Sequence, residues 1–397
     1  MRVAIISDTF PPLRTSGAVQ LRDLSIEFMR QGHETIVLVA DPSIHKRYII
    51  EDYYGVTVAR LKSPQTKGLG YIRRTLGEIG TPFSMICNLK ASPLGDHHFD
   101  AIVWYSPTIF LGPIVRWLKK RYTAKSYLIL RDIFPQWAAD MGIVSRGPIF
   151  RFFNLIANYQ YRSADVIGVQ AHGNLAFFQA NGLSGLSAKL EVLHNWLADI
   201  SDVGSPIDIA QTCLRGRRIF VYAGNMGTAQ HLDKLVNLAI NLRKRSDIGF
   251  LFVGRGSEVE RLRRLVTEYE LTNVLFEDEI DPEHIPGLYA QCHVGMVCLD
   301  GRHKTHNIPG KLLSYLQAGL PILASVNEGN DLIAEIERNA VGLASVASDG
   351  GDLVPLAIAL ADDDWSSSSV KERCWKLSRE RFAPETAVRQ IVAAVRI

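Results

Sequence analysis

NIPGKLLSYLQAGLPILAS, residues 307–325, decides the fold of this chain. The pattern predicts a loop, a short helix and a buried strand, because Pro309 suits a first helical turn, Gly319 suits a helix end and Pro321 blocks continuation. Such a helix points its free N–H groups and the positive end of its dipole at whatever lies beside it, and Lys311 adds a full charge. The segment therefore indicates a seat for a phosphate, with an ordinary strand–helix–strand connection as the alternative.

The rest of the chain alternates between apolar strands and amphipathic helices. In the first half we expect strands at 2–6, 35–40, 101–104, 126–130 and 166–169, and helices at 19–31, 112–122 and 149–163. In the second half we expect strands at 219–223, 249–253, 274–276 and 294–297, and helices at 231–245, 258–269 and 285–291. Unbroken apolar strands that alternate with helices predict an α/β fold with parallel sheets covered on both faces.

The length of the chain predicts two domains, because 397 residues exceed one ordinary core. The alternation weakens over 199–218, which contains Gly204-Ser205-Pro206 and suits an interdomain connection. We therefore expect doubly wound, Rossmann-like domains at 1–200 and 201–375, and a helical tail at 376–397 that is a candidate to pack back on the first domain. Ligands of such sheets bind at the carboxyl ends of the strands, so the expected site is a cleft between the domains.

The composition describes a folded globular protein. Hydrophobic residues make up 47% of the chain and charged residues 21%. We expect no secretory leader or membrane span, because the apolar run at 3–6 is interrupted at once and no stretch approaches about 18 apolar residues. Five scattered cysteines without a C-x-x-C pair argue against a disulfide framework or a zinc site and favour a reducing cytoplasm.

The net charge of +3 conceals an asymmetry between the two halves. Residues 1–200 carry a balance of +7, whereas residues 201–397 carry a balance of −4. The first half is therefore expected to face an anionic partner. Nucleic acid is one candidate, and an anionic membrane leaflet or a lipid pyrophosphate within it is the other.

Four segments at predicted strand ends carry glycines or charges that suit contact with phosphate. They are TSGA at 15–18, YAGNMG at 222–227, VGRG at 253–256, and the loop and helix at 307–319 with His303, Lys304 and His306 just upstream. Each segment taken alone also fits a plain turn. None has the Gly-Lys-Ser/Thr ending of a P-loop or the G-x-G-x-x-G spacing.

Taken in this order, the segments resemble the retaining glycosyltransferases of family 4, which adopt the two-domain GT-B fold. The matching motifs include NVLFEDEIDPEHIPGLYAQCHVGMVCL at 273–299 and KLLSYLQAGLPILAS at 311–325. The opening segment 6–40 resembles the acceptor-side start of that family. The segments LILRDIFPQWAADMGI and YAGNMGTAQHL, at 128–143 and 222–232, resemble a bacterial branch that builds O-antigen and capsule oligosaccharides and includes N-acetyl-L-fucosamine transferases.

The resemblance implies a UDP-sugar donor in the second domain and an acceptor in the first. The donor-binding residues that it implies are Gly17, Gly224, Asn225, Gly227, Gln230, Arg255, Glu279, Asn307, Pro309, Gly310, Leu312, Ser314 and Glu328. The implied catalytic residues are Arg131, Asp132, His306 and Lys311. Two family glutamates are His306 and Ser314 here, the family's pyrophosphate-binding Arg and Lys are replaced around Asn225 and Gln230, and a first-domain histidine is Arg131.

The expected reaction is a retaining transfer that needs neither a metal nor another cofactor. Backbone N–H groups at Gly227 and Gly310, together with Lys311, would stabilise the leaving diphosphate, which can itself accept the proton of the acceptor hydroxyl. No Asp-x-Asp motif follows a strand, and the acidic run at 362–364 suits a solvated helix end. Asp132 is expected to order the acceptor hydroxyl or the donor sugar, with helix capping as its alternative role.

The expected acceptor is a polyprenyl-diphosphate-linked saccharide at the inner face of the cytoplasmic membrane. Basic residues at 60–74 and the segment WLKKRY at 117–122 suit an anionic membrane surface, and the aromatic helix at 149–163 suits either the interface or the core. Three alternatives stay open: a nucleotide-sugar 2-epimerase of the same architecture, a catalytically silent subunit and a nucleic-acid-binding protein. No nucleic-acid module is recognised, so we expect no nucleic acid as partner.

Overall fold

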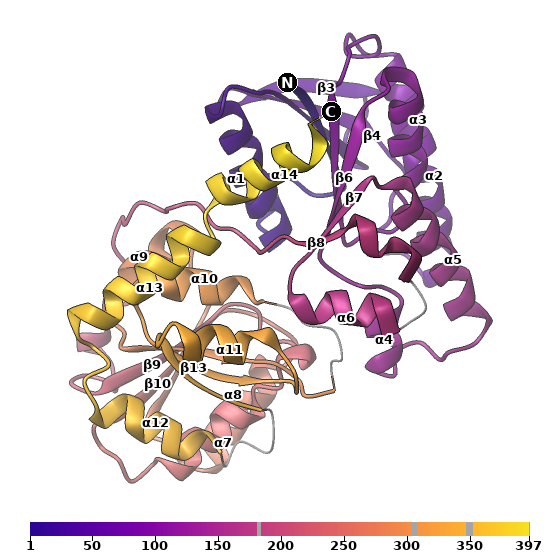
Figure 1. The fold of residues 1–397 in the computed structure, drawn as a ribbon. Helices are drawn as coiled ribbons and strands as arrows, with labels where there is room; N and C mark the ends of the chain where they lie inside the picture. Colours follow the sequence, from indigo (N-terminus) through magenta and orange to yellow (C-terminus); the bar gives the residue numbers. More distant parts are fainter. Residues whose placement is uncertain (181–183, 303–307, 347–351, 397) are drawn as a thin grey trace. The chain divides into compact units, whose positions relative to one another are not determined.

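The computed structural model describes residues 1–180, 184–302, 308–346 and 352–396. The chain forms two compact units, which are described separately (Figure 1). The first unit comprises Met1–Trp196 and Pro384–Ile397, and the second comprises Leu197–Ala383. The observed division lies at residues 196 and 383, whereas the sequence led us to expect boundaries at 200 and 375.

An eight-stranded sheet forms the centre of the first unit, in the order β3-β4-β2-β1-β5-β6-β7-β8. Its strands are β1 (Arg2–Ser7), β2 (Glu34–Asp41), β3 (Tyr48–Tyr53), β4 (Val56–Lys62), β5 (Ala101–Ser106), β6 (Lys125–Leu130), β7 (Val166–Val169) and β8 (Leu190–Val192). All neighbouring strands pair in parallel except β3 and β4, which form an antiparallel hairpin at the edge. The parallel sheet expected from the sequence therefore carries one antiparallel hairpin at its edge, which was not predicted.

Helices cover both faces of this sheet. On one face, α1 (Ser16–Arg30) and α14 (Pro384–Val395) pack together and share a core with alternate residues of β1 and β5. On the other face, α3 (Gly112–Tyr122) packs between α2 (Tyr71–Lys90) and α5 (Pro148–Ser163). The shorter helices are α4 (Gln136–Asp140) and α6 (His172–Ala180).

The end of the chain returns to the first unit. Helix α14 lies beside α1 (Figure 1). The side chains of Val388 and Ile391 on α14 are fully buried in the core that contains Leu24 of α1. Helix α13 (Ser368–Arg381) instead belongs to the second unit, where it packs against α10 (Gly310–Gln317). The segment that was expected to form one tail from residue 376 is therefore divided between the two units.

A six-stranded parallel sheet forms the centre of the second unit, in the order β11-β10-β9-β12-β13-β14. Its strands are β9 (Arg218–Ala223), β10 (Ile248–Val253), β11 (Val274–Glu277), β12 (Val294–Cys298), β13 (Ile322–Val326) and β14 (Gly342–Val346). Besides α10 and α13, its helices are α7 (Asp233–Asn241), α8 (Val259–Glu268), α9 (Ile285–Tyr289), α11 (Asp331–Arg338) and α12 (Leu353–Asp362). Separate apolar cores lie on the two faces of this sheet, so the doubly wound α/β fold predicted from the sequence is confirmed.

The segment quoted first forms a helix and a buried strand, with a small shift at the start. Pro309 is the N-cap residue of α10 and not part of its first turn, and Gly319 follows the helix with a φ of 69°. Strand β13 then follows directly, and all five of its residues are buried. The start of α10 thus lies at the carboxyl edge of the second sheet, where ligands of doubly wound folds bind.

No helix in the described part of the chain is long and apolar enough to span a bilayer. All five cysteines are free.

Candidate functional site

Two glycine loops interlock at the carboxyl edge of the second sheet. The N–H of Gly224, directly after β9, donates to the carbonyl of Val253 at 2.9 Å, and the N–H of Met226 donates to the carbonyl of Arg255 at 2.8 Å. A Cβ on Gly254 would overlap the carbonyl oxygen of Gly224, and its φ of +144° also favours glycine. Both loops therefore present backbone at this edge, with no side chain at either glycine to keep a ligand away.

Helix α10 directs Lys311 toward these loops. The Lys311 Nζ lies 4.6 Å from the centre of the Tyr222 ring, and it would lie 3.7 Å from a Cβ built on Gly224. The side chain is half-buried, and within the described residues it forms no ion pair. Burial lowers the pKa of Lys311 to about 8, because removal from water disfavours the charged form. A bound anion would therefore give the Lys311 ammonium the ion-pair partner that it lacks among the described residues.

Within the described part of the chain, the start of α10 has no side-chain cap and is open at Gly310. Pro309 makes no side-chain capping bond, and the space around Gly310 is open, since a Cβ there would meet no atom within 4 Å. The N–H of Leu312 is taken by the carbonyl of Pro309 at 3.0 Å, and the Leu312 side chain is buried in the core. The buried Leu312 side chain thus positions the helix, while Gly310 borders the open space at the helix start and Lys311 points toward the glycine loops.

Tyr315 holds α10 in register with β9. Its hydroxyl donates to the carbonyl of Val221 at 3.2 Å and accepts from the N–H of Ala223 at 3.3 Å. Gly295 on β12 leaves room for the ring, which a Cβ at that position would overlap. Because Tyr315 lies one turn after Lys311 on the same helix, this contact sets the distance between the ammonium and the end of β9.

The loop after β9 is braced by Gln230. Its side-chain Oε1 accepts from the N–H of Gly227 at 3.0 Å and from Nδ2 of Asn225 at 3.3 Å. The Gly227 N–H, which we expected to serve the leaving diphosphate, is therefore already paired within the loop. A ligand that uses this donor has to displace the Gln230 amide.

Two further predicted donor-binding residues pair with each other. Arg255 Nε lies 3.2 Å from Glu279 Oε2, and both side chains are largely exposed. Glu328 is also exposed, in the turn between β13 and α11. The two remaining predictions in this region, His306 and Asn307, lie outside the described residues.

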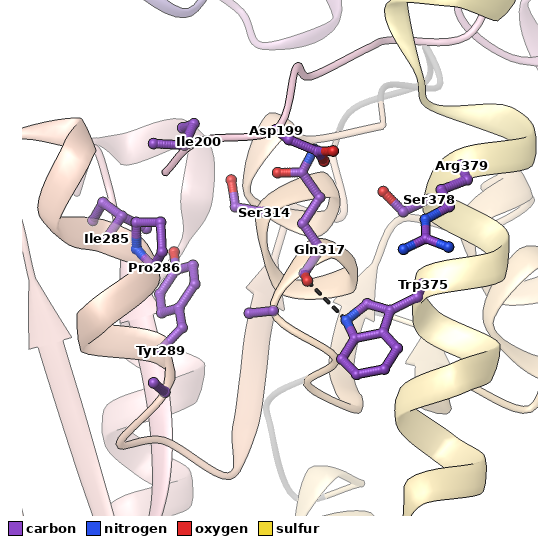
Figure 2. Close-up of a pocket in the computed structure, with 12 residues that line it drawn as sticks. Asp199, Ile200, Ile285, Pro286, Tyr289, Ser314, Gln317, Trp375, Ser378 and Arg379 are labelled. Carbon is purple, nitrogen blue, oxygen red and sulfur yellow. Dashed lines mark hydrogen bonds between the residues drawn. The ribbon is translucent and has the colours of Figure 1, made fainter. Parts of the chain in front are cut away.

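Ser314 faces a pocket on another side of α10 (Figure 2). The pocket has a volume of about 390 Å³ and lies within the second unit, among α9, α10, α13 and residues 199–200. Figure 2 shows Gln317 accepting a hydrogen bond from Trp375 Nε1, at 2.9 Å through its carbonyl oxygen. Lys311 does not line this pocket, so Ser314 and Lys311 contact different spaces.

The first unit places Arg131 and Asp132 directly after β6. The Arg131 guanidinium is buried, donates from Nη1 to the carbonyl of Leu193 at 3.0 Å and lies 4.7 Å from the Trp196 ring. Asp132 is half-buried, and burial raises the pKa of its carboxyl, with the charge of Arg131 opposing the rise. Arg131 is therefore a supporting residue, and Asp132 is the one closer to solvent.

Gly17 lies in the first turn of α1 and contacts Tyr105. A Cβ at Gly17 would lie 3.2 Å from the Tyr105 hydroxyl, which donates to Gln20 Oε1 at 3.0 Å. The glycine thus allows α1 to approach the end of β5 closely. Gly17 itself is buried in this contact, so its predicted role in ligand binding stays a prediction.

Asp8 is a candidate that the sequence analysis did not single out. It follows β1 directly, its Oδ1 is buried without a hydrogen-bond partner among the described residues, and burial raises the pKa of its carboxyl. It lines a pocket of about 260 Å³ within the first unit, with Arg60, Lys67 and Glu78. The sequence did contain a signal for this residue, because Asp8 is a carboxylate directly after a buried strand.

No three His, Cys, Asp or Glu side chains among the described residues gather as a metal site would require. The second unit offers a lysine ammonium and helix N–H groups, which suit a diphosphate. The first unit offers the half-buried carboxylates of Asp8 and Asp132, which suit hydroxyl groups of a saccharide.

Comparison with known proteins finds that most of the second unit is similar to a known family. Residues 217–362 match the family described as Glycosyl transferases group 1. WbjE of Pseudomonas aeruginosa, whose name describes a glycosyltransferase, is 22% identical over 277 residues, covering 68% of each chain. WcaI of Escherichia coli K12, named as a glycosyl transferase of colanic acid biosynthesis, is 20% identical over 343 residues, covering 80% of this chain and 82% of the relative.

Solved structures share the whole architecture. The trehalose-phosphate synthase of Burkholderia xenovorans has a TM-score of 0.72 at 13% identity, with all of both chains covered. The sucrose-phosphate synthase of Thermosynechococcus elongatus has a TM-score of 0.70 at 16% identity, covering 99% of this chain and 97% of the other. Anabaena HepE in complex with UDP has a TM-score of 0.68 at 13% identity, covering 99% of both. The matched domain, the two relatives and the shared architecture together support a glycosyltransferase enzyme with the GT-B fold, as the sequence predicted.

Proposed function

We propose that this protein is a retaining, metal-independent glycosyltransferase that moves a sugar from a UDP-sugar to a lipid-linked saccharide. The proposed sugar is an N-acetylhexosamine or a deoxy derivative of one, and the proposed pathway is O-antigen, capsule or exopolysaccharide assembly. The observation that carries the proposal is the position of Lys311, at the start of α10 and against Gly224 at the end of β9.

The donor follows from the chemistry of that position. A nucleoside diphosphate carries negative charge that helix N–H groups and an ammonium stabilise, and this charge grows as the anomeric C–O bond breaks. Donors that are already in place strengthen as the charge develops, so they lower the barrier more than they tighten substrate binding. HepE, which shares the fold, was crystallised with UDP and with UDP-glucose, which supports a uridine nucleotide here.

We propose retention because the chain resembles retaining glycosyltransferases, and the cationic site suits the mechanism that retention requires. The acceptor hydroxyl attacks from the side on which the diphosphate leaves, and a diphosphate oxygen takes the hydroxyl proton. The new glycosidic bond forms as the old C–O bond breaks, so no protein base is required. We assign Asp132 the role of ordering the acceptor hydroxyl or the donor sugar, because it is a half-buried carboxylate at a strand end.

The acceptor proposal rests on the relatives and on charge. WcaI is named for colanic acid biosynthesis, and the basic first half of this chain suits an anionic lipid carrier. We propose a polyprenyl-diphosphate-linked saccharide, met at the inner face of the cytoplasmic membrane by a peripheral protein.

The test is a panel of nucleotide sugars, first screened by thermal shift and then used in transfer assays. We expect a UDP-sugar to stabilise the protein and to be consumed only when a polyprenyl-diphosphate-linked saccharide is present, and nuclear magnetic resonance should show retained anomeric configuration in the product. A new epimer formed without acceptor would make the protein a 2-epimerase instead. Absence of stabilisation by every nucleotide sugar would favour a catalytically silent subunit.

A further inference from the structure

The helical layer on one face of the first unit combines a strong positive charge with exposed apolar stripes. This layer consists of α2, α3 and α5, and α3 contacts both of the other helices. Helix α3 has four basic residues and no acidic one, α5 has two basic residues and none acidic, and α2 has three basic residues and Glu78. Helices α1 and α14 on the opposite face carry equal numbers of basic and acidic residues.

Several of these basic residues do not stabilise the fold through ion pairs. Arg73 on α2, Lys120 on α3 and Arg151 on α5 are exposed, and none of them forms an ion pair within the part of the chain that the structure describes. Basic residues without acidic partners project into solvent from all three helices. They therefore give the layer a field that attracts an anionic partner.

Helix α2 is apolar on two sides. One side, with Met85 and Leu89, is buried in the core. The other side carries Ile72 and Leu76, one helical turn apart, which are 79% and 64% exposed. Tyr71 in the same first turn is 89% exposed. A core-facing helix needs only one apolar stripe, so the second stripe is available for contact outside the chain.

Helix α5 repeats this arrangement on the far side of α3. Ala157 and Tyr161 are buried in the core, whereas Ile149, Phe152 and Leu155, spaced three residues apart, are exposed. The sequence analysis left core and interface as alternatives for this helix, and the structure gives it one buried face and one exposed face. Exposed aliphatic and aromatic side chains thus lie on both sides of the basic helix α3.

We infer that the α2–α3–α5 layer docks on an anionic lipid bilayer, with Ile72, Leu76 and Leu155 entering the interface and the basic residues meeting lipid headgroups. A bilayer fits because it offers anionic headgroups above an apolar interior, so both features of the layer gain a partner. Nucleic acid would leave the aliphatic side chains in water. A second copy of this face would place two strongly positive surfaces together. The inference rests on the proposed function only for its purpose, which is access to a lipid-linked acceptor.

The test measures binding of the full chain to vesicles by sedimentation. We expect binding to phosphatidylcholine vesicles that contain about a quarter phosphatidylglycerol, and little binding to phosphatidylcholine alone. The variant with Arg73→Glu, Lys120→Glu and Arg151→Glu should bind more than about 100-fold more weakly, since each basic residue near such a surface contributes roughly fivefold. The matched control reverses Lys244, Arg264 and Lys376 of the second unit, and it should bind like the wild type.

A second pair of variants tests the apolar stripe. Ile72→Ser with Leu76→Ser should weaken vesicle binding at least about tenfold, whereas Val203→Ser with Tyr269→Ser, exposed apolar residues of the second unit, should not. Wild-type binding by both the charge-reversal and stripe variants would overturn the inference. The inference would also be overturned if the protein bound duplex DNA as tightly as the vesicles and the Ile72→Ser, Leu76→Ser variant bound DNA equally well. The same holds if that variant were a monomer and the wild type a dimer.

The proposed function is judged separately with the same proteins. UDP binding by calorimetry should be unchanged in the charge-reversal and stripe variants, because their substitutions lie in the first unit, whereas Lys311 belongs to the second. Loss of vesicle binding with UDP binding intact supports the inference. Normal vesicle binding by a wild type that binds no nucleotide sugar would instead reject the proposed function and leave the docking surface in place.

Discussion

The ammonium of Lys311 lies 4.6 Å from the centre of the Tyr222 ring. The ring's negative face offsets part of the cost of removing the cation from water, by about 0.5–2 kcal/mol. Tyr222 is fully buried on β9 and its hydroxyl donates to the carbonyl of Asn225 at 2.8 Å, so the ring is a rigid platform. The sequence analysis did not identify Tyr222, because its role depends on a contact between β9 and α10.

Replacement of Lys311 by alanine is expected to weaken catalysis strongly. The variant loses one donor to the leaving diphosphate, which corresponds to about 2–4 kcal/mol of transition-state stabilisation. Steady-state kinetics and calorimetry with UDP measure the change. Lys376→Ala, an exposed lysine of the second unit, is the matched control and should behave like the wild type. Near-normal kinetics for Lys311→Ala would remove this residue from the mechanism.

The affinity for UDP is expected to fall as the pH rises above about 8. The pKa of Lys311 in the free protein is lowered to about 8, and a bound diphosphate would raise it. Between these two values the complex holds one more proton than the free protein, so affinity declines by up to about tenfold per pH unit. Calorimetry across this range tests the prediction. Lys311→Arg keeps its charge and should show no such decline up to about pH 9; a decline shared by both proteins would point to another group.

Gly310→Ala is expected to raise the stability of the protein while it weakens UDP binding. A Cβ at this position meets no atom within 4 Å, so alanine at the first helical position should raise stability by about 0.5–1 kcal/mol. The same methyl group would stand where we expect the diphosphate, so UDP should bind at least about tenfold more weakly. Thermal unfolding without ligand and calorimetry with UDP give the two values.

A comparison variant is Gly254→Ala, whose Cβ would overlap the Gly224 carbonyl at a φ of +144°. It should lose about 2–3 kcal/mol of stability or more. Unchanged UDP affinity in Gly310→Ala would mean that the ligand does not approach the start of α10.

Asp132→Asn is expected to lower turnover without lowering stability. Burial raises the pKa of Asp132 in the folded protein, so its ionised form reduces stability at neutral pH, and a neutral amide removes that cost. Loss of a charged hydrogen bond to a substrate hydroxyl, about 1.5–3 kcal/mol, should reduce kcat roughly 10- to 100-fold. Thermal unfolding and kinetics test both parts. A large drop in melting temperature would show that Asp132 serves the fold instead.

Treatment with a chelator is expected to leave activity unchanged. In the proposed mechanism, Lys311 and the start of α10 carry the charge of the diphosphate. Transfer assays with EDTA, and with Mg²⁺ added back, measure whether the activity depends on a metal ion. Activity that is lost with EDTA and restored by Mg²⁺ would require a metal in the reaction.

Periodicity alone located most elements that border the site. Unbroken apolar runs predicted β1, β6, β9, β10 and β12 to within two residues. Pro309 and Gly319, which favour a helix start and a helix end, predicted α10. Patterns of this kind succeed where a strand is buried on both faces, since every residue is then apolar. The edge strand β3 was missed because its residues, among them Glu51 and Asp52, are half-exposed and show no such run.

Helix α2 shows why other parts were not predictable. No helix was expected over this range, which contains the helix-disfavouring residues Gly77, Gly80 and Pro82, yet all three lie within α2. A Cβ on Gly77 would lie 2.7 Å from the carbonyl oxygen of Gln65, so the glycine permits close packing of a distant segment. Likewise, the pairings of Gln230 with Gly227 and of Arg255 with Glu279 depend on loop geometry that spacing does not encode.

The return of α14 to the first unit sets the order in which the protein is completed during synthesis. Val388 and Ile391 cover apolar residues of α1 and the sheet, but the ribosome makes them only after the entire second unit. The nascent first unit therefore keeps an uncovered hydrophobic face while the second unit is translated and folds. A product that terminates early, just after α13, would keep that face exposed to chaperones and proteases.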